Sequence, residues 1–267
     1  MNSQAGDYFN GLSPLHQMVA KHLLFLGVEG QFANRTNFQN VYSGFVAEVE
    51  GHWLWITAGH VIQELIDAVR AGATIVAKHF YDIGPVHWSP VDCPYDLTSI
   101  VFFDEDGSRD FALLELRVLT VEALKANQVE PISQQSVAPV TVAFDHYCLV
   151  GAPSEYQENA EGLVSFAPVM LVLKRLPDDV KADGFRRYRF DVSPSRDSWP
   201  DGELQSIVGT SGGPVFGFLT DSAEKTLSYS CIGIQSSWMA EKWESYACPL
   251  RVILDAVRAS LRSTQGD

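Results

Sequence analysis

The chain of 267 residues contains no long hydrophobic run. A membrane-spanning helix needs roughly 18 to 20 consecutive apolar residues, and no segment approaches that length. The first residues, 1–7, also lack the basic start and apolar stretch of a secretory signal. We therefore expect a cytoplasmic protein that does not partner with a membrane.

Positive charge is scarce as well. The sequence has 19 lysines and arginines against 33 aspartates and glutamates, which gives a net charge of −14. Because phosphate binding needs a basic surface, this balance argues against a nucleic-acid partner. Hydrophobic residues make up 46% of the chain, with 20 glycines and 13 prolines, which is the profile of a globular protein with many turns.

Cysteine pairs and metal-ligand spacings are also missing. The four cysteines do not lie close together in the sequence, and we expect them to be reduced, buried thiols: Cys93, Cys148, Cys231 and Cys248. His79, His87 and Cys93 have no recognised zinc spacing. The acidic turn at residues 104–107 lacks the oxygen spacing of a calcium loop. We expect neither a metal ion nor a cofactor.

What the chain does contain is the segment Gly-Thr-Ser-Gly-Gly-Pro at residues 209–214. Its glycines allow backbone conformations closed to other residues and let a substrate carbonyl approach main-chain amides. Ser211 is the candidate nucleophile. A serine in a glycine-rich turn can also simply cap the backbone, so the hypothesis requires a histidine base and an orienting carboxylate.

Two other segments supply these groups. Residues 41–50 and 53–57 predict a hairpin that leads to His60, followed by a short helix at residues 61–70. Residues 110–116 predict a strand that opens on Asp110. Each residue alone has an ordinary structural explanation, as a core histidine or as a turn aspartate. The three together favour one catalytic site in the order His60, Asp110, Ser211.

This order distinguishes between classes of serine hydrolase. In an α/β-hydrolase the histidine follows the serine, but the last histidine here is His146. In a subtilisin-type enzyme an aspartate precedes the histidine, and the only aspartate before His60 is Asp7 in the polar N-terminal segment. Both arrangements are excluded.

Three segments of the chain resemble the signature blocks of the trypsin/chymotrypsin-like serine peptidases. They are Thr-Ala-Gly-His at residues 57–60, Asp-Phe-Ala-Leu-Leu at residues 110–114 and the glycine-rich segment at residues 209–214. The resemblance extends from about residue 43 to about residue 261 and implies an all-β fold of two six-stranded antiparallel barrels with a C-terminal helix. It places His60 and Asp110 in a first unit, residues 1–130, and Ser211 in a second, residues 131–267. The disulfides beside the histidine and serine of many secreted relatives have no counterpart here, which is typical of a bacterial-type member.

The resemblance also implies the role of each site residue. His60 acts as general base and acid, Asp110 orients it, and the amides of Gly209 and Ser211 form the oxyanion hole. The substrate is a protein or peptide. A catalytically idle relative that only binds peptides is the alternative, because a collapsed oxyanion loop is invisible in a sequence.

Substrate preference and activation follow from the same alignment of motifs. The primary pocket would be formed by Gln205 at its base and by Ser236, Ser237 and Trp238 along one wall. Without an aspartate at the base we expect a neutral or mixed preference, unless Asp201 or Glu203 supplies the charge. Thr210 stands where digestive members carry the aspartate that pairs with a new N-terminus. We therefore expect activity without cleavage, with the oxyanion loop ordered by local hydrogen bonds or by a regulatory protein partner.

Overall fold

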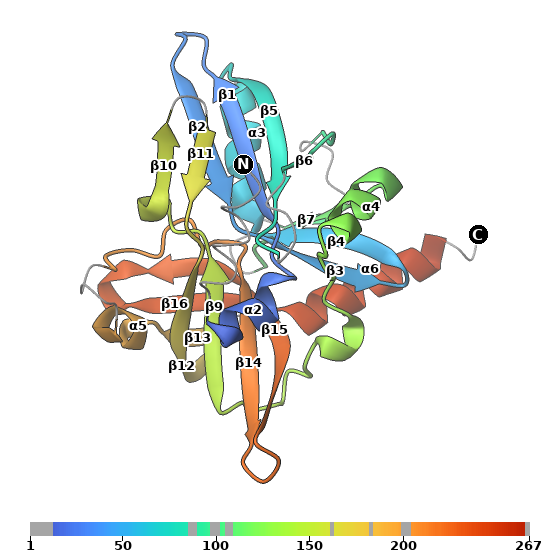
Figure 1. Cartoon of the computed structure of the whole chain (residues 1–267), viewed down its shortest axis with the longest axis vertical. Helices are drawn as coiled ribbons and strands as arrows, with labels where there is room; N and C mark the ends of the chain where they lie inside the picture. The colour runs from blue at the N-terminus through green and yellow to red at the C-terminus, as the bar shows by residue number, and fades with distance from the viewer. Residues whose placement is uncertain are drawn as a thin grey trace.

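The structure, a computed structural model, describes residues 13–84, 90–96, 102–104, 109–160, 163–181, 184–198 and 204–264. It is mostly β, with short helices on the outside (Figure 1). The helices are α2 (Pro14–Ala20), α3 (Gly59–Arg70), α4 (Val118–Ala126), α5 (Ser193–Ser198) and α6 (Leu250–Thr264). None of the helices within these ranges is long and apolar enough to cross a membrane.

The C-terminal half contains a closed six-stranded antiparallel barrel in the order β12-β13-β16-β15-β14-β9. Its strands are β9 (His146–Gly151), β12 (Val169–Val180), β13 (Arg186–Asp191), β14 (Pro214–Asp221), β15 (Thr226–Met239) and β16 (Glu244–Pro249). The sequence predicts strands of this half at residues 140–150, 162–174, 185–192, 215–219 and 227–235. It does not predict β16, whose end at Cys248 and Pro249 is read as the start of the final helix. Pro249 instead ends the strand, where its missing N–H is tolerated.

One predicted strand of this half is wrong. Residues 162–174 do not form a single strand but divide into β11 (Leu163–Phe166) and the start of β12. Pro168 stands in the gap and cannot donate a ladder hydrogen bond. β11 pairs with β10 (Gln157–Ala160) as a separate hairpin that lies beside β2 (Figure 1).

The N-terminal half is arranged as two four-stranded sheets among the described residues, in the orders β2-β1-β5-β6 and β3-β4-β8-β7. Their strands are β1 (Phe25–Gln31), β2 (Asn37–Tyr42), β3 (Phe45–Val49), β4 (His52–Thr57), β5 (Thr74–Tyr81), β6 (Val91–Asp92), β7 (Phe102–Asp104) and β8 (Phe111–Glu115). The sheets meet where Leu23 bridges Phe45 and where β2 runs into β3 through Ser43 and Gly44. The expected second closed barrel is therefore not shown, and the division near residue 130 stays a prediction.

The β3–β4 hairpin explains the position of His60. Its two-residue turn, Glu50 and Gly51, has positive φ angles of 52° and 85°, which suits the twist of a tight hairpin. β4 then contributes a continuous buried run and passes directly into α3, which begins at Gly59. Since β4 also pairs with β8, the sheet brings the start of α3 next to Asp110.

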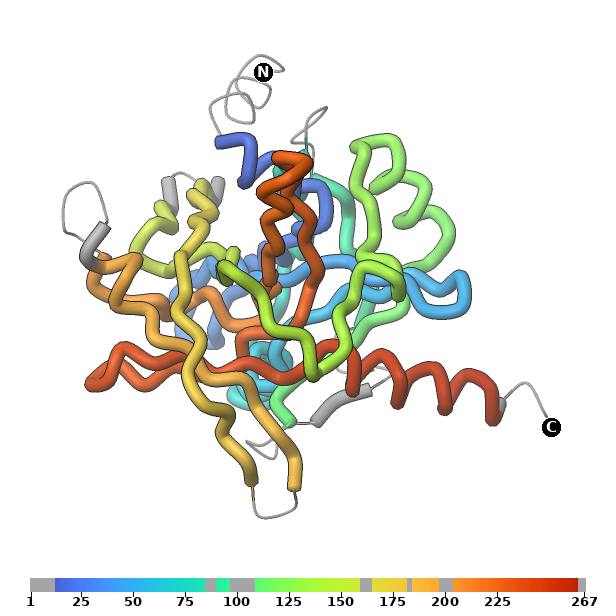
Figure 2. The backbone as a smooth tube through the Cα atoms, turned by 90° about the horizontal axis from the view of Figure 1, so that it is seen from below, coloured from blue at the N-terminus to red at the C-terminus, as the bar shows by residue number. Residues whose placement is uncertain are grey.

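The two halves share a hydrophobic core. One cluster of buried side chains includes Phe45 and Ile56 from the N-terminal half together with Phe216 and Ile234 of the barrel and Leu254 of α6. α6 extends outward from this core to the side of the molecule where the C-terminus lies (Figure 2). The shared core fixes the relative position of the loops that carry the candidate site.

All four cysteines are free and buried. Burial raises the pKa of Cys93 to about 11 and that of Cys248 to about 12. The pKa values of Cys148 and Cys231 are raised further by the same cause. The thiols are therefore protonated and shielded, and their reactivity is low.

Candidate active site

His60 and Asp110 form a two-point hydrogen-bonded pair at the start of α3. The Nδ1 atom of His60 donates to Oδ2 of Asp110 over 2.6 Å, and the backbone amide of His60 donates to Oδ1 over 2.8 Å. The second bond satisfies an amide of the first helical turn, which has no partner within the helix. The aspartate side chain is 10% exposed and the histidine side chain 48% exposed. Asp110 therefore fixes the ring orientation and leaves Nε2 available as a proton acceptor.

The surroundings of His60 favour its charged form. Burial alone lowers the pKa of His60, but the hydrogen bond to Asp110 and the charges of Asp110 and Glu64 act in the opposite direction. The net result is a pKa above the ordinary histidine value. Such a pair can take up a proton and stabilise the resulting imidazolium, as general base catalysis requires.

The loop that carries Ser211 is held by hydrogen bonds from within the chain. The fully buried Thr210 donates both its amide, over 3.1 Å, and its hydroxyl, over 2.8 Å, to the carbonyl of Ile207. Gly213 donates to the carbonyl of Thr210 over 2.8 Å, and Gly212 donates to that of Gln235 on β15 over 2.8 Å. Thr210 therefore orders this loop through local hydrogen bonds.

Two amides of this loop have no acceptor. Among the described residues, no group accepts a hydrogen bond from the backbone N–H of Gly209 or from that of Ser211. The carbonyl of Val208 accepts from the amide of Ser154 over 2.8 Å, and no peptide bond within the described ranges is cis. Since a trans peptide holds its C=O and N–H in opposite directions, this bond directs the Gly209 N–H away from Ser154. Both residues are half-buried, and amides without a protein acceptor are the donors that an oxyanion hole needs.

The N-terminal half supports this loop directly. The hydroxyl of Ser43 donates to the carbonyl of Gly209 over 2.8 Å and accepts from the amide of Ala152 over 2.9 Å. Thr57, three residues before His60, donates its hydroxyl to the carbonyl of Ser43 over 2.8 Å. The site is therefore assembled across the boundary between the two halves.

His60 and Ser211 border the same cavity, whose volume is about 300 Å³. It is lined by residues of the Ser211 loop, of α3 and of β2, together with two residues that follow β9: Val208, Gly209, Ser211, His60, Val61, Glu64, Asn40, Val41, Tyr42, Ser154 and Gln157. In this structure no hydrogen bond joins His60 to Ser211, both of which are described. The cavity exposes the nucleophile, the base and the unpaired amides to one bound group.

The structure does not bring the predicted specificity residues to this cavity. Gln205 is exposed on the preceding loop, and Ser236 is buried with its hydroxyl donating to the carbonyl of Tyr246 over 3.2 Å. Ser237 accepts from the Arg187 guanidinium over 3.3 Å, and Trp238 packs edge-on against Trp243. Asp201 and Glu203 lie outside the described residues. The primary pocket stays a prediction.

Several residues of the site are missed by sequence reasoning. Glu64 lies four residues after His60, and this spacing in a predicted helix indicates that the two side chains lie on the same helix face. Gln157 clamps the Val41 backbone, accepting from its amide over 3.1 Å and donating to its carbonyl over 2.9 Å. No local pattern predicts Gln157, because its partner is more than 100 residues away in sequence.

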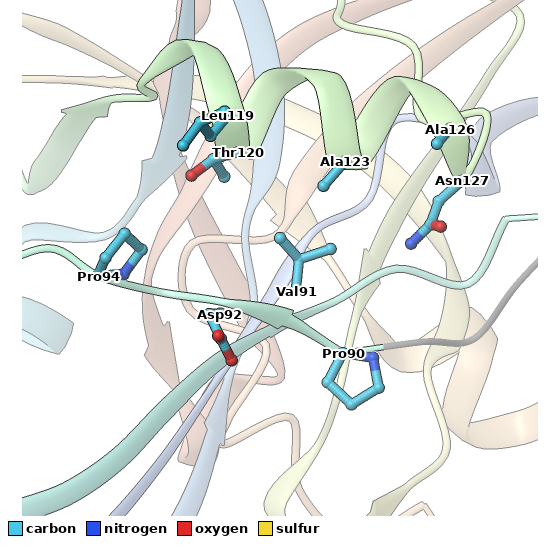
Figure 3. Close-up of a pocket in the computed structure, with 9 residues that line it drawn as sticks. All are labelled: Pro90, Val91, Asp92, Pro94, Leu119, Thr120, Ala123, Ala126 and Asn127. Carbon is cyan, nitrogen blue, oxygen red and sulfur yellow. The ribbon is translucent and has the colours of Figure 1, made fainter.

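A further cavity lies away from the candidate triad. Its volume is about 620 Å³, and it lies between β6 and α4 (Figure 3). Its polar groups are used structurally, since Asn127 donates to Asp82 over 2.7 Å and Thr120 accepts from Tyr95 over 3.0 Å. No group of three or more His, Cys, Asp or Glu side chains that could hold a metal ion occurs among the residues described.

No protein-family model matches the chain. A search of curated proteins also returns no match. Among solved structures, the chain is similar to the protease Anisep from Arthrobacter nicotinovorans, with 15% identity, a TM-score of 0.45 and coverage of 86% of this chain and 90% of that one. It is also similar to a serine endoprotease from Yersinia pestis, with 13% identity, a TM-score of 0.48 and coverage of 94% and 68%, respectively. At such low similarity, the roles of the site residues have to be judged from the chain itself.

Proposed function

We propose that the chain is a serine endopeptidase with a chymotrypsin-like double-barrel fold, in which the N-terminal sheets correspond to the first barrel. His60, Asp110 and Ser211 act as the catalytic triad, and the Gly209 and Ser211 amides form the oxyanion hole. The observation that carries this proposal is the pair of unpaired amides, which border the same cavity as Ser211 and His60. A peptide-binding relative without activity has no need of unpaired amides beside a serine.

The proposed reaction follows the geometry of these groups. Nε2 of His60 takes the proton of Ser211 Oγ as that oxygen bonds to the substrate carbonyl carbon, and the two amides hold the resulting oxyanion. The imidazolium then gives this proton to the leaving nitrogen as the C–N bond breaks, which leaves an acyl group on Ser211. Attack by water, with His60 again as base, releases the acid and restores the hydroxyl.

A fluorophosphonate probe tests the proposal on the full-length, uncut chain. Because such probes react only with activated serines, we expect one label per molecule, mapped by mass spectrometry to Ser211. Ser211→Ala should abolish labelling. Ser206→Ala is the matched control, because Ser206 lies on the same loop and only accepts from the Val208 amide over 3.1 Å. Absence of label in the wild-type chain, or label that persists in Ser211→Ala, would contradict the proposal.

The pH dependence gives a second test. The base must be neutral to accept a proton, and Asp110 and Glu64 hold the pKa of His60 above the ordinary value of about 6.5. We therefore expect kcat/KM to fall as the pH is lowered, with an apparent pKa above about 6.5. The profile should be measured from about pH 5 to about pH 9 with a peptide substrate. An apparent pKa below the ordinary histidine value would be inconsistent with this site geometry.

A further inference from the structure

The cavity beside the candidate triad is bordered by His60 and Glu64 of α3 and by Tyr42 of β2. This inference rests on the proposed function. In the proposed reaction His60 delivers a proton to the leaving nitrogen, so the leaving segment has to lie against the part of the cavity that His60 borders. Tyr42 of β2 and Glu64, one helical turn after His60, border the same cavity.

A carboxylate is fixed in this part of the cavity. The hydroxyl of Tyr42 donates to Oε1 of Glu64 over 3.1 Å, and the Asn40 amide donates to that hydroxyl over 3.1 Å. Tyr42 is 8% exposed, and burial, together with the charge of Glu64, raises its pKa, so that it remains a protonated donor. Two neutral donors in series therefore orient Glu64 without neutralising it.

Among the described residues Glu64 has no ion-pair partner, and the titratable cation that its charge affects is the imidazole of His60. Within the described ranges, neither lysine nor arginine pairs with Glu64, and its second carboxylate oxygen, Oε2, has no hydrogen-bond partner. By contrast, Asp67, one turn further along α3, pairs with Arg70 over 3.3 Å. The exposed side chain of Glu64 thus presents a carboxylate without an ion-pair partner at the edge of a cavity that a substrate side chain can enter.

We propose that Glu64 is a specificity-determining residue that binds a positively charged side chain, Lys or Arg, in the first two positions on the leaving-group side of the cleaved bond. The long, flexible stems of these side chains reach along the cavity wall while the charged end meets the carboxylate. The Tyr42 hydroxyl is a positioning group that fixes Glu64 in the required place.

A randomised synthetic peptide library tests this inference, because it presents every residue type on the acyl side at once. Wild-type, Glu64→Gln and Asp67→Asn proteins are compared at equal concentrations of probe-reactive enzyme, and cleavage sites are read by mass spectrometry. We expect about fivefold enrichment of Lys and Arg over Gln at the two leaving-group positions in the wild type, the factor that a partly exposed ion pair provides. Glu64→Gln should remove the enrichment.

Asp67→Asn is the matched control. It removes one negative charge from the same helix, and its side chain is 59% exposed and does not border the cavity. It should keep the wild-type enrichment. Tyr42→Phe, which releases Glu64 without removing its charge, should reduce the enrichment to about twofold.

The outcomes separate this inference from the proposed function. Failure of the wild type to react with the fluorophosphonate probe would overturn the proposed function and this inference with it. Probe labelling and cleavage without basic enrichment would overturn this inference alone. An equal loss of enrichment in Glu64→Gln and Asp67→Asn would assign the effect to net charge. A uniform slowing of all substrates by Glu64→Gln would assign Glu64 to the support of His60; either result excludes the recognition role.

Discussion

Asp110→Asn should reduce kcat for peptide hydrolysis by about 10⁴-fold, the loss found when the orienting carboxylate of a serine triad is replaced by its amide. The reason lies in the 2.6 Å bond from Nδ1 of His60 to Oδ2 of Asp110. An asparagine NH₂ group in that place donates instead of accepting, so Nδ1 must give up its proton and Nε2 becomes protonated. The base then has no free lone pair toward Ser211.

A second histidine–carboxylate pair provides the control. Nδ1 of His52 donates to Oε1 of Glu115 over the same distance, 2.6 Å, between neighbouring strands β4 and β8, and neither residue borders the cavity with Ser211. Glu115→Gln should therefore leave kcat within about twofold of the wild type. Steady-state kinetics and near-ultraviolet circular dichroism on both variants check the effect and the fold. If Asp110→Asn keeps more than about a tenth of the activity, Asp110 is not the orienting group.

Gly209→Ala should lower kcat by about 10² to 10³-fold, the cost of losing one oxyanion donor. Gly209 has a φ of +96°, and a Cβ there would lie 2.6 Å from the amide nitrogen of Ser154 and 2.8 Å from the carbonyl oxygen of Ala152. Both contacts are with backbone atoms, which cannot turn aside as a side chain does. The 208–209 peptide must therefore rotate, and the Gly209 N–H leaves its position beside Ser211.

Gly72→Ala separates this effect from simple backbone strain. Gly72 has a φ of +90°, but a Cβ there meets no atom within 4 Å. Its expected cost is about 1 kcal/mol of stability with unchanged kcat. The test is to measure kcat, KM and the thermal unfolding temperature of Gly209→Ala and Gly72→Ala. Equal activity of Gly209→Ala and the wild type would exclude a catalytic role for the Gly209 amide.

The elements next to the site could be predicted because local patterns specify them. The apolar run that forms β4, the tight turn at Gly51 and the helical spacing after His60 all have the expected structure. The strand that opens at Asp110 and the C-terminal helix are likewise found. The residues that determine each of these elements lie close together in the sequence. Hydrophobic periodicity and turn residues therefore predict them.

The remaining features depend on contacts between distant segments. β16 is stabilised by pairing with β13 and β15 and carries a proline that locally favours a break. The unpaired amide of Gly209 depends on the bond between Ser154 and Val208, more than 50 residues apart in sequence. The primary pocket, in which Gln205 is placed by a count from Ser211, stays a prediction. Such features cannot be read from composition or spacing.

The support of the Ser211 loop by Ser43 and Thr57 has a consequence for the order of events during synthesis. His60 and Asp110 can pair once the first 120 or so residues have left the ribosome, since their strands adjoin in one sheet. The loop around Gly212 is positioned only when β15 supplies the Gln235 carbonyl, and β15 closes the barrel only with β16, which ends at Pro249. Under the proposed function, a chain that ends before β16 should therefore show no hydrolytic activity.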